Sequence, residues 1–112
     1  VLLECQKQDI PILAIRAVQA GALTSSMDRE PHPSGLDKAD FMDFKKALPF
    51  RKIANEWGES PASLAHRFSL SVNKVSSVIL GVKNRQELQE CIDAESKGEL
   101  SPYEMETLLN LF

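Results

Sequence analysis

The sequence predicts an α/β fold that is rich in helix and contains two parallel strands. Two short apolar runs, over residues 10–15 and 75–80, lack the alternation of a half-exposed strand, and this is typical of strands buried on both faces of a parallel sheet. Segments with helical periodicity lie between the two runs and after the second one. Strands that alternate with helices indicate parallel βα units.

The first half of the chain contains a helix end, the first strand and a long loop. The apolar pattern of Val1–Cys5 predicts the last turns of a helix whose beginning is missing, so we expect the chain to be a fragment of something longer. The strand over residues 10–15 follows. Serines, prolines and a glycine are concentrated between Ser25 and Asp37, which predicts a long surface loop. Loops of this length are usually functional or mobile.

Start and stop signals divide the second half of the chain into helices. Apolar residues at helical spacing predict a helix that breaks near Pro49 and resumes until Gly58. Ser60 followed by Pro61 is the predicted N-cap and first residue of the next helix. Two more helices are predicted after the second strand, each with its N-cap three residues before a glutamate, as in a capping box: Asn84 with Glu87, and Ser101 with Glu104.

Composition restricts the classes of protein to which the chain can belong. With 112 residues, 43% hydrophobic and 26% charged, it has the length and composition of one globular domain. Thirteen basic and sixteen acidic residues give a net charge of −3, so we expect neither nucleic acid nor anionic lipid as a partner. The sequence has no apolar run of about 20 residues that would span a membrane. Two cysteines without metal-ligand spacing favour a reducing cytoplasm.

The junction between the second strand and the next helix is the segment best suited to bind an anion. The strand ends at Gly81, and a helix that begins at Asn84 presents backbone N–H groups and the positive end of its dipole. Lys83 and Arg85 flank this point, and an arginine can hold a phosphate through two parallel hydrogen bonds. The alternative interpretation is a solvated first turn with two incidental cations.

Several stretches, in this order and at this spacing, resemble the C-terminal third of the aldo-keto reductases. Ile12–Leu23 is similar to the seventh barrel strand and the turn after it. Glu59–Phe68, Ser77–Gly81 and residues 84–90 are similar to the penultimate helix, the eighth strand and the helix that follows, and Leu100–Glu104 is similar to the tail helix. The resemblance implies that residues 1–112 form the C-terminal part of a TIM (β/α)8 barrel: its last two βα units plus the tail helix.

The resemblance also implies an oxidoreductase that uses NADP to reduce a carbonyl to an alcohol, with NADPH and a small carbonyl substrate as partners. Gly81, Lys83, Asn84 and Arg85 match the junction that grips the adenosine 2′-phosphate in that family. The family's catalytic Asp, Tyr, Lys and His lie on earlier strands. We therefore expect the 112-residue chain alone to be inactive.

Two further positions match functional places of the family. Glu90 matches its acidic residue on the helix after the eighth strand, whereas Cys91 stands where an Asn commonly contacts the adenine. Arg16 falls at the end of the first strand, on the face where barrel enzymes place function. We expect Arg16 to meet the cofactor pyrophosphate or a substrate anion, and pairing with a neighbouring carboxylate is the alternative. His32 and His66 lack a second ligand at metal spacing and are assigned to the surface or a helix edge.

Two other functions remain open on the sequence alone. Ala54, Gly58 and Leu64 fit the spacing of a helix-turn-helix DNA-binding regulator, although the few cations on the second helix and the acidic net charge favour the enzyme. A non-catalytic relative that binds the cofactor as a sensor is the other alternative. Because two strands cannot close a barrel, we also expect exposed sheet edges and self-association of the isolated chain.

Overall fold

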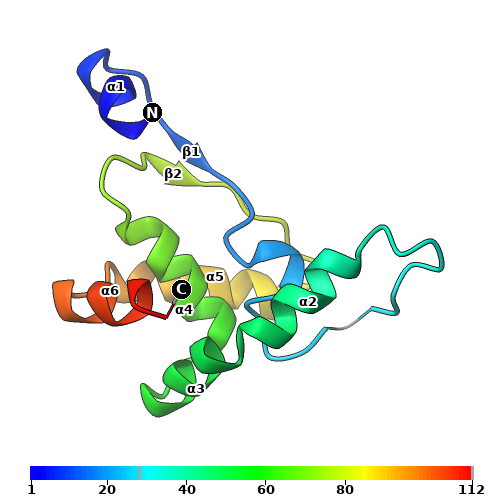
Figure 1. Cartoon of the computed structure of the whole chain (residues 1–112). Coiled ribbons are helices and arrows are strands. Elements are labelled where there is room, and N and C mark those ends of the chain that lie inside the picture. Colours follow the sequence, from blue (N-terminus) through cyan, green and yellow to red (C-terminus); the bar gives the residue numbers. More distant parts are fainter. Residues whose placement is uncertain (28, 112) are drawn as a thin grey trace.

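The computed structural model describes residues 1–27 and 29–111 and arranges most of them as a cluster of helices beside a small sheet (Figure 1). Part of the predicted loop over residues 25–37, namely residue 28, lies outside the described residues. The elements follow one another as the sequence predicts. In chain order they are α1 (Leu2–Lys7), β1 (Leu13–Ala14), the 3-10 turn η1 (Gln19–Gly21), α2 (Lys38–Lys46), α3 (Leu48–Glu56), α4 (Pro61–Ser71), β2 (Ser77–Val78), α5 (Arg85–Lys97) and α6 (Pro102–Leu109).

The two strands pair in parallel, as predicted. Leu13 lies opposite Ser77, and Ala14 lies opposite Val78. The carbonyl of Ala14 accepts a hydrogen bond of 2.8 Å from the N–H of Ile79, which continues the ladder beyond the paired residues. The long segment between the strands, which includes α2, α3 and α4, therefore acts as a crossover connection of the kind that parallel pairing requires.

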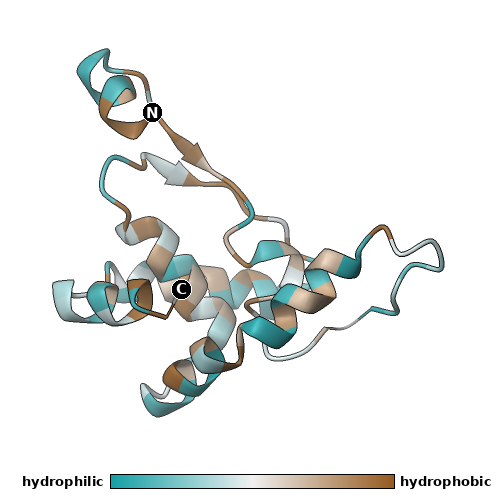
Figure 2. Cartoon of the chain, viewed as in Figure 1, coloured by the Kyte–Doolittle hydropathy of each residue, from teal (hydrophilic) through white to brown (hydrophobic). Residues whose placement is uncertain are grey.

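The prediction that both strands are buried on two faces is wrong for this chain. Leu13 is 57% and Ile15 is 67% exposed, whereas Ile12 and Ala14, which point to the opposite face, are half-buried. The described helices therefore cover one face of the sheet only. In Figure 1 the strands lie at the side of the helix cluster, with α1 beyond them, and Figure 2 shows that β1 is apolar.

The hydrophobic core lies among the helices and not against the sheet. Its buried members come from α3, α4, α6 and the residue that leads into α6. Partly buried side chains from residues next to η1, from α3, α4 and α6, and from residues just after α3 and α6 complete it. The six buried residues of this core are Phe50, Ala54, Leu64, Ala65, Leu100 and Leu108.

The predicted helix starts are confirmed in position, with one difference in detail. Ser60 caps α4 by accepting the N–H of Ser63 at 3.1 Å, and Ser101 and Glu104 form a complete capping box. The break predicted near Pro49 falls at Ala47, because proline fits the first turn of α3, where its missing N–H costs no helical hydrogen bond.

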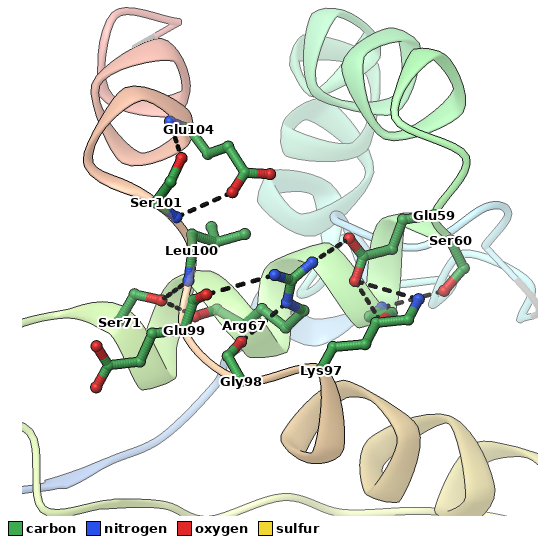
Figure 3. A network of polar contacts seen from close by, with 11 residues as sticks. Glu59, Ser60, Arg67, Ser71, Lys97, Gly98, Glu99, Leu100, Ser101 and Glu104 are labelled. Carbon is green, nitrogen blue, oxygen red and sulfur yellow. Dashed lines mark hydrogen bonds and ion pairs between the residues drawn. The ribbon is translucent and has the colours of Figure 1, made fainter.

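Arg67, in the middle of α4, ties this helix to the connection between α5 and α6 (Figure 3). Its Nη1 lies 2.7 Å from Oε2 of Glu59, and the two side chains are only 13% and 5% exposed. Its Nε donates to the carbonyl of Gly98 at 2.9 Å. The second carboxylate oxygen of Glu59 accepts the hydroxyl of Ser63 at 2.7 Å and lies 3.7 Å from Nζ of Lys97. Both charges of the pair thus have several partners.

Ser71 extends this network to the start of α6. Its hydroxyl donates to the carbonyl of Arg67 at 2.6 Å and accepts the N–H of Leu100 at 2.8 Å. Leu100 belongs to the core and directly precedes the cap of α6. The polar network and the apolar core therefore both hold α4 against the start of α6.

Arg67→Met should destabilise the fold by about 3–5 kcal/mol, because it leaves the buried Glu59 carboxylate without its main counter-charge. Urea denaturation followed by circular dichroism measures this loss. Arg29→Met is the matched control, since Arg29 is 43% exposed and pairs with Asp40 at 3.0 Å. An exposed pair of this kind contributes about 0–1 kcal/mol. Equal losses in the two variants would contradict the account.

The open sheet edges and the uncovered face of β1 lead us to expect self-association. Light scattering should show a mass that rises with protein concentration. Leu13→Lys places a charge on the uncovered face and should shift the chain toward the monomer, whereas Leu109→Lys, at an exposed leucine on α6, should not. A monodisperse monomer that melts cooperatively at all concentrations would contradict this expectation.

Candidate functional site

The carboxyl ends of β1 and β2 meet at one edge of the sheet, because the strands are parallel. Two residues beyond the last paired residues, the chain reaches Arg16 after β1 and Leu80 after β2. Gly81 and Lys83 then lead to α5. The structure thus brings the two predicted parts of the site, Arg16 and the junction over residues 81–85, to the edge at which βα proteins place function.

The start of α5 has the backbone groups that an anion site needs. Oδ1 of Asn84 accepts the N–H of Glu87 at 2.9 Å, which confirms Asn84 as the N-cap. The N–H groups of Arg85 and Gln86 lie in the first turn and have no acceptor further back in the helix. A helix of 13 residues also presents the positive end of its dipole here. These N–H groups can donate hydrogen bonds to a phosphate or carboxylate oxygen, and the helix dipole attracts its negative charge.

The charges at this helix start are mixed. Lys83 and Arg85 are both exposed, on either side of the cap. Glu87 does not complete the capping box that the sequence predicts with Asn84, since its carboxylate accepts the N–H of Lys83 at 2.7 Å. An incoming anion therefore meets two cations and the N–H groups of the first turn, which attract it. It also meets the Glu87 carboxylate, which repels it and already accepts the N–H of Lys83.

Arg16 pairs with a neighbouring carboxylate, which is the second of the two roles that the sequence left open. Its Nη2 lies 3.4 Å from Oδ1 of Asp40, at the start of α2, and its side chain remains more than half exposed. Asp40 also pairs with Arg29 of the long loop, whose Nη2 lies 3.0 Å from Oδ2 of Asp40. The backbone of Arg16 has a φ of 58°, in the left-handed region, where the chain turns away from β1. Arg16 thus sits at the expected edge, paired with a carboxylate that it shares.

Glu90 points from α5 toward the start of α4. Its Oε1 accepts the hydroxyl of Ser60, the residue that caps α4. No local pattern in the sequence predicts this contact, because 30 residues separate the two side chains. That Glu90 binds the cofactor stays a prediction.

His66 is a further residue that sequence reasoning misplaced. It is buried in α4, not at the surface or a helix edge, and its Nδ1 has no hydrogen-bond partner in the described part of the chain. Its Nε2 lies 3.5 Å from Sγ of Cys91 on α5. The available signal was the small, weakly polar composition of residues 61–71, which is typical of a helix surrounded by others.

Burial sets the protonation of this pair. Burial lowers the pKa of His66, and the nearby Glu90 carboxylate partly offsets the effect. Burial also raises the pKa of the Cys91 thiol, and the negative charges of Glu90 and Glu87 raise it further. Cys91 is therefore a protonated thiol at neutral pH, a weak hydrogen-bond donor that packs against an imidazole.

The described residues contain no group of His, Cys, Asp or Glu side chains that could hold a metal ion. None of the helices over residues 1–27 and 29–111 is both long and apolar enough to cross a membrane.

The structure does not support the helix-turn-helix alternative. A recognition helix needs an exposed face that can enter the major groove. In α4 the corresponding residues Ser63, Ala65 and His66 are buried, and Arg67 is held by Glu59 and Gly98.

The free energy of unfolding should decrease as the pH falls through about 6.5, the ordinary pKa of histidine. The pKa of His66 is lower in the folded chain than in the unfolded chain, so the unfolded chain binds more protons in this range. Urea denaturation at about pH 7.5 and about pH 5.5 measures the effect. His66→Gln should flatten this dependence, whereas His32→Gln, at an exposed histidine, should leave it unchanged. A dependence that persists in His66→Gln would contradict the assignment.

Comparison with known protein families identifies a relationship that covers the chain. The sequence model of the aldo/keto reductase family matches residues 1–111. No curated protein matches the chain closely enough to count as a relative. The family match covers nearly the whole chain and agrees with the order of helices and parallel strands described above, and this chain therefore belongs to the aldo/keto reductase family of oxidoreductases.

Proposed function

We propose that this chain forms the adenosine side of the NADP site in an aldo-keto reductase barrel that reduces a carbonyl to an alcohol. The proposal is supported mainly by the groups gathered at the start of α5. This helix start combines two cations with unpaired N–H groups at the carboxyl edge of a parallel sheet, beside a helix dipole. The family match supports a nicotinamide cofactor and a carbonyl substrate for the fold as a whole.

The donors at this junction fit a phosphate monoester. Arg85 presents a planar fork of N–H groups and Lys83 a compact positive charge, and both are exposed. Gly81 has no side chain, and nothing lies within 4 Å of the place where a Cβ would stand, so the approach to the helix start is open there. A dianionic 2′-phosphate has enough charge to compete with the nearby Glu87 carboxylate. We therefore assign NADP and not NAD as the cofactor.

Two other residues complete the proposed site. Glu90, later on the same helix, would accept a hydrogen bond from the amino group of the adenine. Arg16, at the end of β1, would exchange its shared partner Asp40 for the cofactor pyrophosphate or a substrate anion. The exchange would cost little, because Arg16 is more than half exposed and an exposed ion pair contributes little by itself.

The cofactor would supply the hydride, and the residues of this chain would hold and orient its adenosine end. A family barrel has eight strands, whereas the described part of this chain contains two. The catalytic Asp, Tyr, Lys and His that the resemblance implies would come from the other strands of that barrel. We therefore expect the 112-residue chain by itself to reduce no carbonyl.

Arg85→Ala should weaken binding of NADPH by about tenfold or more, because it removes a charged hydrogen-bond donor to the 2′-phosphate. Binding of NADH, which lacks that phosphate, should change little. Titrations followed by the fluorescence of the reduced nicotinamide measure both affinities. Lys45→Ala, at an exposed cation on α2, is the matched control and should affect neither. Equal weakening of NADPH and NADH by Arg85→Ala would remove the assignment of the 2′-phosphate.

A further inference from the structure

Ser60 uses one hydroxyl group to join the start of α4 to Glu90 on α5. Its Oγ accepts the N–H of Ser63 at 3.1 Å, which is the N-cap hydrogen bond of α4. The proton of the same hydroxyl is donated to Oε1 of Glu90. A hydroxyl has one proton to donate, so the two bonds together fix its orientation. The orientation of the Glu90 carboxylate is fixed in turn.

Further contacts hold the residues around Ser60 in place. The preceding residue, Glu59, is held by Arg67 and by the hydroxyl of Ser63. The contact between His66 and Cys91 lies between the same two helices. Because α4 and α5 are thus joined at several points, Ser60 keeps its place relative to the start of α5.

Glu90 keeps capacity for a ligand while it is held in this way. A carboxylate has about four acceptor sites on its two oxygens, and the bond from Ser60 uses one of them. Cys91, the neighbour of Glu90 on α5, presents a protonated thiol that contacts His66 and is a weak donor. Cys91 therefore offers little to a purine edge, whereas Glu90 keeps acceptor sites for one.

We propose that Ser60 is a positioning residue that orients the Glu90 carboxylate toward the exocyclic amino group of the cofactor's adenine. The proposal rests on the function proposed above. Selectivity follows from it, because a carboxylate accepts from an amino group and repels the carbonyl oxygen that hypoxanthine carries at the same place. Ser60 would thereby determine the preference for adenine without touching the cofactor itself.

Three substitutions separate this role from helix capping. Ser60→Thr keeps both the acceptor for the N–H of Ser63 and a proton for Glu90. Ser60→Asp keeps the acceptor, and aspartate is a good N-cap, but it has no proton to donate and adds a like charge beside Glu90. Ser60→Ala loses both hydrogen bonds. A purely structural role would make the Asp variant resemble the Thr variant.

The test compares NADP⁺ with its hypoxanthine analogue by isothermal titration of the whole chain. The original chain and Ser60→Thr should bind NADP⁺ about tenfold more tightly than the analogue. In Ser60→Asp and Ser60→Ala this ratio should fall to about one. Circular dichroism at the temperature of the titration checks that the Asp variant keeps the helix content of the Thr variant.

Two results would overturn the positioning role of Ser60 but leave the proposed NADP site standing, as long as the chain binds NADP⁺ with an affinity that depends on Arg85. One is a full preference for adenine in Ser60→Asp, and the other is no preference in the original chain. If the original chain binds neither nucleotide, both this proposal and the proposed function are wrong. The loss of preference in Ser60→Asp with its retention in Ser60→Thr supports the positioning role.

Discussion

Arg67 and Glu59 form the ion pair that fixes how α4, α5 and α6 lie relative to one another. Removing two charges from water is costly, and this pair offsets the cost only because both partners have further hydrogen bonds. Arg67 reaches the carbonyl of Gly98, at the end of α5, and Glu59 accepts the hydroxyl of Ser63. The candidate site depends on this arrangement, since the start of α5 can face the sheet edge only while the rest of α5 is held against α4.

The two halves of the candidate site are held with different rigidity. The α5 side belongs to the helix cluster, which has an apolar core and the polar network around Arg67. The Arg16 side follows a two-residue strand with one uncovered face and relies on an exposed ion pair with Asp40. Preorganisation for an anion is therefore greater at Lys83 and Arg85 than at Arg16. We therefore expect the 2′-phosphate to be held more firmly than the pyrophosphate.

Local signals predicted most of the fold, and long-range contacts account for what they missed. Ser60, Asn84 and Ser101 are found as the helix caps that their sequence neighbours predict, and the parallel pairing follows from two separated apolar runs. Exposure of β1 was not predictable from its own residues, because burial of a strand depends on what covers it. The burial of His66 and its contact with Cys91 likewise depend on how α4 and α5 pack together.

The central claim is that the start of α5 binds the 2′-phosphate of the adenosine. An NMR titration of the isotope-labelled chain with adenosine 2′,5′-bisphosphate tests it most directly, because this probe carries the phosphate without the nicotinamide. The account predicts saturable shifts of the backbone amides over residues 81–87, together with the side-chain signal of Arg85. Saturable shifts confined to other parts of the chain, or no saturable shifts at all, would contradict it.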